Sequence, residues 1–148
     1  MEGRLVSTWW TLKIALGLAA LVAGLDKFFN VLTNWTDYLN PVATQYVPLA
    51  PDVFMRGVGI VEIIVGLAIL TRWTRLGAAV ARLWFVAIAV NLVAMHKYYD
   101  IAVRDLVLAV SAFTLERLSA VRQASRVLSD SDARPWQPSP REILTLKL

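Results

Sequence analysis

The sequence of 148 residues contains no cysteine and only one histidine. The lack of cysteine excludes disulfide bonds, thiolate metal sites and thiol–disulfide catalysis. A single histidine excludes a polyhistidine metal site within one chain. The sequence also lacks the glycine-rich motifs that bind nucleotides, the zinc-protease helix motif and the nucleophile-elbow motif. Because it has no haem-ligating histidine pair, flavin motif or metal cluster, we predict no metal and no redox centre of its own.

Charged residues are also scarce. They make up 18% of the chain, while 57% of the residues are hydrophobic. Soluble domains average about 25% charged and about 45–50% apolar residues. The apolar residues form four long runs, and spans of about 17 to 25 residues can cross a bilayer. The sequence therefore predicts an all-α, polytopic membrane protein, an antiparallel four-helix transmembrane bundle with spans at about 11–32, 53–70, 76–97 and 101–118.

The segments outside the spans have their own expected roles. The N-terminus has the outline of a signal peptide, but the apolar run continues past Lys27 and no small-x-small cleavage site stands out, which favours a span. Residues 33–52 contain three prolines and are predicted to form a short lid on the membrane surface. The transmembrane domain would cover residues 1–118. Residues 119–148 would form a cytoplasmic tail that is partly an amphipathic helix.

The distribution of basic residues predicts the orientation. Four spans place both termini and residues 71–75 on one side, and 11 of the 15 lysines and arginines fall on that side. By the positive-inside rule, we expect both termini to be cytoplasmic in the cell (inner) membrane. The same rule accounts for the net charge of +4 without a nucleic-acid partner.

Several polar residues fall inside the predicted spans. A charged side chain at the centre of a membrane helix costs about 2.5–3.5 kcal/mol, so each is a functional hypothesis. Glu62 lies about 13 Å into the second span, too deep to reach the head groups. Antiparallel packing would gather these residues in the outer half of the bilayer. The predicted polar pocket consists of Asp26, Lys27, Glu62, Asn91, His96, Arg104 and Asp105.

A structural interpretation of the same residues stays open. Lysine and arginine in the pocket would pair with two of its three acids, and buried ion pairs can fix helix register without binding a ligand. Asn91 has the chemistry of an interhelical bridge, and His96 at the rim that of a solvated side chain. Arg82 and Glu116 are predicted to form a structural pair between the third and fourth spans.

Three segments resemble a known family. Residues 23–28, Ala-Gly-Leu-Asp-Lys-Phe, are similar to the small-Gly-x-x-Lys end of helix one in the DoxX family of four-helix membrane proteins. Residues 59–70, with a glutamate four residues before a glycine and a basic turn after them, resemble its second helix. Residues 104–106 resemble the opening of its last span. The resemblance covers about residues 10–118 and implies a membrane subunit associated with quinol oxidase or thiosulfate:quinone oxidoreductase assemblies.

The first functional hypothesis is therefore a subunit of a respiratory or redox complex that binds a quinone or quinol. A quinone head needs hydrogen-bond donors and proton acceptors at membrane depth, and the electrons would pass through a partner subunit. The candidate proton-transfer residues are Glu62, Asp105 and His96, and the candidate quinone-binding residues are Lys27, Arg104, Asn91 and Asp26.

Two other functions stay open. The chain could be a non-catalytic accessory subunit that contacts other membrane subunits and lipid through its helix faces and basic tail, or form a homo-oligomer. It could also be a transporter of a small molecule or of protons. We rank that last, because the inner half of the spans is apolar apart from Arg82 and Glu116.

Overall fold

The computed structural model describes residues 3–46 and 49–132, and within them the fold is all-α, as predicted. The elements are α1 (Gly3–Asp26), the 3-10 helix η1 (Trp35–Tyr38), α2 (Pro41–Tyr46), α3 (Pro51–Leu70), α4 (Thr74–Ala94) and α5 (Tyr99–Asp132). The part of the predicted tail from residue 133 onward lies outside the described residues.

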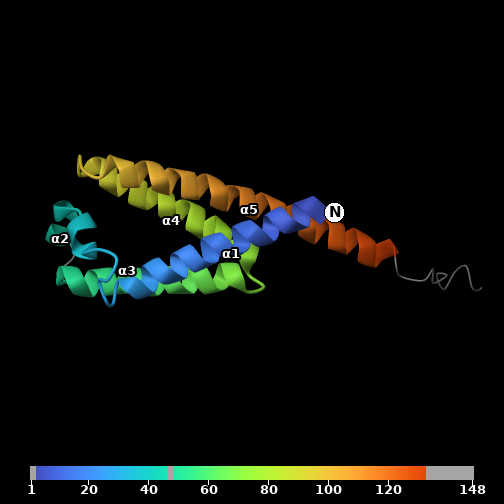
Figure 1. Cartoon of the computed structure of the whole chain (residues 1–148), viewed down its shortest axis with the longest axis horizontal. Coiled ribbons are helices and arrows are strands. Elements are labelled where there is room, and N and C mark those ends of the chain that lie inside the picture. Colours follow the sequence, from blue (N-terminus) through green and yellow to red (C-terminus); the bar gives the residue numbers. More distant parts are fainter. Residues whose placement is uncertain (1–2, 47–48, 133–148) are drawn as a thin grey trace, which may run out of the picture.

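The four long helices form two pairs, α1 with α3 and α4 with α5 (Figure 1). The pairs approach each other near the N-terminus and diverge toward the opposite end, where η1 and α2 lie (Figure 1). We call the diverging end, with residues 27–46, residues 49 and 50 and the turn at 95–98, the loop end. The terminal end carries the start of α1 and the turn at 71–73.

Three helices, α1, α3 and α4, are long and apolar enough to cross a membrane by length and composition. The apolar part of α5, residues 101–118, carries four charged side chains, and this helix completes the bundle by packing along α4. The outward faces are apolar: Ile64, Leu83 and Val110 are 60, 64 and 65% exposed. Such faces suit a hydrocarbon solvent and support the predicted membrane bundle.

The first predicted span, 11–32, is wrong at its C-terminal end. The helix stops at Asp26 because Asn30 takes up left-handed backbone torsion (φ 53°) and donates its N–H to the Asp26 carbonyl oxygen at 2.6 Å. A residue in this conformation reverses the chain at a helix C-terminus. Residues 27–32 therefore lead into η1 rather than extending the helix.

The third and fourth predicted spans also differ from the helices. The predicted span 76–97 ends too late, since α4 stops at Ala94 and His96 and Tyr98 have positive φ of 54° and 57°. In the other direction, α5 runs without a break past Leu118 to Asp132. Its last turns extend beyond the turn at 71–73 (Figure 1).

Glycine sets the spacing between α1 and α3. A Cβ atom on Gly24 would lie 2.7 Å from the carbonyl oxygen of Gly59, and one on Gly59 would lie 2.6 Å from that of Gly24. The two backbones are therefore in direct contact, as small residues allow in membrane helices. By contrast, a Cβ atom on Gly57 would have no atom within 4 Å.

We predict that Gly59→Ala lowers the thermal unfolding midpoint in mild detergent, because the added methyl group must push the two backbones apart at a cost of about 1–3 kcal/mol. Gly57→Ala on the same helix is the matched control and should leave the midpoint unchanged or raise it, since alanine favours helix. Equal midpoints for the two variants would contradict the close contact.

Candidate functional site

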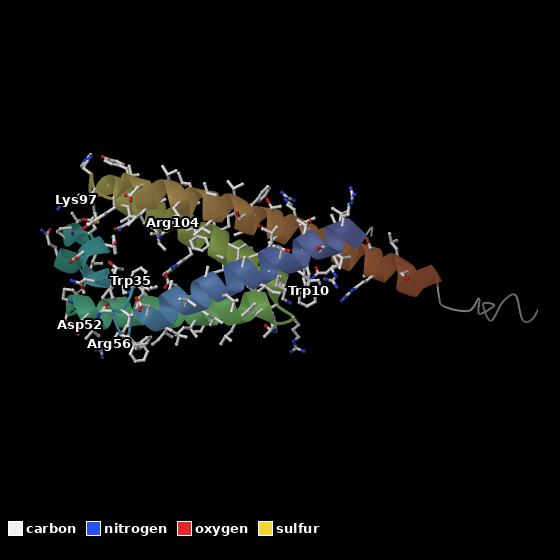
Figure 2. The ribbon with its side chains drawn as sticks, viewed as in Figure 1. Trp10, Trp35, Asp52, Arg56, Lys97 and Arg104 are labelled. Carbon is white, nitrogen blue, oxygen red and sulfur yellow. The ribbon has the colours of Figure 1, made fainter. Side chains whose placement is uncertain are left out.

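A cavity of about 590 Å³ lies between the two helix pairs near the loop end. Most of its lining is aliphatic or aromatic. The lining side chains that can form hydrogen bonds or ion pairs are Lys27, Thr33, Trp35, Tyr38, Glu62, Trp84, Asn91, Arg104 and Asp105. Trp35 lies on the α1–α3 side and Arg104 on the α4–α5 side (Figure 2). The cavity therefore draws its polar groups from both helix pairs.

The ion pair between Lys27 and Glu62 is the most buried charged contact of the cavity. Lys27 Nζ lies 2.5 Å from Glu62 Oε2, and the two side chains are 4 and 8% exposed. Glu62 is about 16 Å from the start of α3, so its carboxylate cannot reach water along its own helix. Lys27, in the turn after α1, points back toward the bundle and satisfies this charge. This pairing confirms that a lysine of the predicted pocket offsets one of its acids.

Two tryptophans enclose the ion pair. Lys27 Nζ lies 3.6 Å from the ring centroid of Trp35, which is a close cation–π contact. On the other side, Trp84 of α4 directs its indole N–H to Glu62 Oε1 at 3.5 Å, a long hydrogen bond. Aromatic faces and an indole donor thus stabilise both charges in an apolar surrounding.

The second ion pair is formed by neighbours on α5. Arg104 donates from both Nε (3.2 Å) and Nη2 (3.1 Å) to Asp105 Oδ1. Asp105 is buried, while the Arg104 side chain is 60% exposed. Since both residues line the cavity, the guanidinium keeps further N–H donors for another partner there.

Asp26 does not line the cavity, contrary to the predicted pocket. Its carboxylate accepts hydrogen bonds from the backbone N–H groups of Val31 and Leu32 and from the indole of Trp35 at 2.8 Å. Asp26 therefore holds the segment after α1 in place, and it positions the indole that covers Lys27.

Asn91 and His96 lie in different positions relative to the cavity. Asn91 lines the cavity and donates from Nδ2 to the carbonyl oxygen of Tyr38 at 3.0 Å, which ties η1 to α4. His96 is exposed in the α4–α5 turn, does not line the cavity, and has Nδ1 3.4 Å from the Tyr99 hydroxyl. The structure thus gathers Lys27, Glu62, Asn91, Arg104 and Asp105 and leaves His96 and Asp26 outside.

The sequence missed Trp84 and Tyr38 as site residues. Trp84 lies within an apolar run and contributes to its hydropathy like any other large apolar residue, so no signal distinguished it. Tyr38 belonged to the predicted lid, and its cavity position depends on the chain reversal after α1. Among the described residues, no three His, Cys, Asp or Glu side chains cluster in a way that could hold a metal ion.

A family model described as DoxX matches residues 8–97. The chain belongs to the DoxX family. The match spans α1, α3 and α4 and includes Lys27 and Glu62. It ends before Arg104 and Asp105, which the resemblance had included. The comparisons with curated proteins and with solved structures gave no match.

We predict that Lys27→Met destabilises this DoxX protein by about 3–5 kcal/mol, because it leaves Glu62 buried and unpaired. The double variant Lys27→Met/Glu62→Gln should recover part of that loss, since no buried charge then remains. Denaturant unfolding in detergent measures both. Arg126→Met is the control: Arg126 is exposed near the end of α5 and belongs to none of the ion pairs of the described residues, so the change in stability should be about 0.5 kcal/mol or less. The predicted pair of Arg82 and Glu116 is present, at 3.1 Å. A double variant no more stable than Lys27→Met alone would contradict a Lys27–Glu62 pair.

We predict that Asp26→Asn speeds hydrogen exchange at the amides of Val31 and Leu32, because a neutral amide replaces a charged acceptor and protection falls by about 1–3 kcal/mol. Hydrogen-exchange mass spectrometry of this segment gives the measurement. Asp37→Asn, which removes a carboxylate exposed on η1, should leave those amides unchanged. Equal exchange in both variants would count against Asp26 as the residue that holds the segment.

Proposed function

We propose that this DoxX-family membrane protein binds a quinone or quinol in the cavity and serves as a subunit of a membrane redox complex. The observation that carries the proposal is the buried Lys27–Glu62 pair within a mostly apolar cavity, opposite the Arg104–Asp105 pair. The proposal rests on three properties of the cavity: its charge, its size and its donors.

The charge of the cavity favours an uncharged ligand. Two cations face two carboxylates, so the paired groups carry no net charge. A small anion or cation would add a charge without a counter-charge to this balanced set, which is costly in low dielectric. A neutral molecule with polar atoms at one end avoids that cost, and a quinone has this form.

The size and lining of the cavity also suit such a ligand. A volume of about 590 Å³ falls within the range of about 300–1,000 Å³ that is usual for small-molecule sites. The aliphatic walls contributed by α3, α4 and α5 offer a surface for an apolar ring and tail. Phe54 and Phe85 add aromatic edges against which a quinone ring can pack.

The two ion pairs supply the donors and acceptors for quinol chemistry. Lys27 Nζ or the Arg104 guanidinium would donate to a carbonyl oxygen, and Glu62 or Asp105 would accept a proton. Oxidation of a quinol to a quinone releases two protons and two electrons. In this proposal the carboxylates take the protons, and a redox centre of a partner subunit takes the electrons.

The orientation of the bundle is also part of the proposal. The start of α1 and the end of α5 both lie at the terminal end, and 8 of the 12 basic residues that the structure describes belong to that side. The positive-inside rule then makes the terminal end cytoplasmic in the inner membrane and directs the cavity toward the outer half of the bilayer.

We predict that the tagged chain, purified in mild detergent, retains close to one quinone per chain and that Glu62→Gln reduces binding about tenfold or more. The reason is that Glu62→Gln replaces the charged carboxylate that would hydrogen-bond the quinone or quinol head. A hydrogen bond to a charged group contributes about 1.5–3 kcal/mol. Mass spectrometry of extracted lipids and co-purified proteins gives both readouts.

Glu116→Gln provides the control, because it makes the same chemical change in an ion pair that does not line the cavity. Its quinone content should match the native chain. Recovery of a large complex whose quinone content is the same in Glu62→Gln would instead make the chain an accessory subunit and its buried charges structural.

A further inference from the structure

Two cations of the terminal end lie against the same pair of indoles. Lys13 Nζ is 4.8 Å from the ring centroid of Trp9 and 5.2 Å from that of Trp10. Arg122 of α5 has its guanidinium carbon 4.0 Å from the Trp9 centroid and 5.9 Å from the Trp10 centroid. The Trp9 indole itself is fixed by its hydrogen bond to Ser119 Oγ at 2.7 Å.

These cations lack an anionic partner within the part of the chain that the structure describes. None of the ion pairs found there includes Lys13 or Arg122. Lys13 is only 6% exposed, and the oxygen that accepts from its Nζ is the carbonyl of Thr71 at 2.9 Å. Arg122 Nη1 is buried and has no hydrogen-bond partner among the described residues.

The cation–π contacts offset only part of this cost. An indole face attracts positive charge, but it does not accept the hydrogen bonds of Nη1 or of the other Lys13 donors in full. Two neighbouring like charges also repel each other in a weakly solvated site. A single anionic group with several acceptor oxygens would satisfy both side chains at once.

The position of the cations selects phosphate as that group. Thr71 caps the C-terminus of α3, so Lys13 Nζ lies level with a helix end. In a bundle that spans a bilayer, helix ends are where we expect the lipid head groups. Trp10 is 45% exposed next to the crossing of α1 and α5 (Figure 2), as tryptophans are at the membrane interface. Beyond this level α1 and α5 continue past the turn at 71–73 (Figure 1).

We propose that Lys13 and Arg122 form a binding site for a phosphate group at the terminal end, independent of the cavity and its proposed quinone. Lysine and arginine are the usual pair for phosphate: the guanidinium donates in a fork and the ammonium acts as a point charge. The phosphate could belong to an anionic phospholipid or be free in solution, and the chemistry of the site is the same for both.

Native mass spectrometry of the full chain in nanodiscs tests the proposal, with phosphatidylglycerol against phosphatidylcholine as the lipid probe. We expect retained phosphatidylglycerol, and about tenfold weaker retention in Lys13→Gln and in Arg122→Gln, the effect of one charge-assisted hydrogen bond. Arg126→Gln is the matched control, one turn further along α5 and exposed, and should bind as the native chain does.

A second arm titrates inorganic phosphate and follows the thermal unfolding midpoint. A rise that disappears in Arg122→Gln, without preference among the lipids, supports the site with free phosphate as its ligand. Arg122→Lys, which keeps the charge, should retain most of the binding and so separates a lost ligand from a misfolded variant. Equal retention of both lipids and no phosphate effect in the native chain would overturn the proposal, as would unchanged binding in both glutamine variants.

Discussion

The ion pair between Lys27 and Glu62 is the interaction on which the loop end depends, because hydrocarbon offers neither charge another partner. Glu62 lies in the middle of α3, and Lys27 reaches it only because α1 ends at Asp26. The direct contact of Gly24 with Gly59 brings the two helices close enough for this reach. The charge pair therefore depends on where α1 ends and on how closely α1 packs on α3.

The same four helices build two different ends. At the terminal end, Trp9, Leu16, Ile69 and Leu115 belong to one buried apolar cluster in which all four helices take part. Toward the loop end the helix pairs diverge around a cavity with paired charges, and a smaller apolar cluster that includes Ala89, Leu92 and Ala102 joins α4 to α5. Packing at one end thus provides the stability that permits a hollow site with buried charges at the other.

The hydropathy of the sequence predicted the helix bundle, and the cost of burying charge placed Lys27 and Glu62 in one pocket. Both predictions depend only on where apolar runs begin and end. For that reason they could not exclude Asp26 from the predicted pocket. Its role is decided by hydrogen bonds to Leu32 and Trp35, and these exist only after the chain has reversed. They also missed Trp84, since a tryptophan inside an apolar run does not interrupt it. Some contacts depend on a turn, and others depend on the direction of one side chain on an apolar helix. Neither kind produces a periodic pattern in the sequence.

Trp35 contacts two adjacent residues of opposite charge. Its N–H binds the carboxylate of Asp26, and its ring face lies on the ammonium of Lys27. Any outward movement of this indole must therefore break both contacts together. The same movement of Trp35 would also uncover Lys27, which neutralises Glu62. Entry of a ligand past this indole would therefore require the loss of both contacts, whereas entry sideways from the lipid would leave both in place.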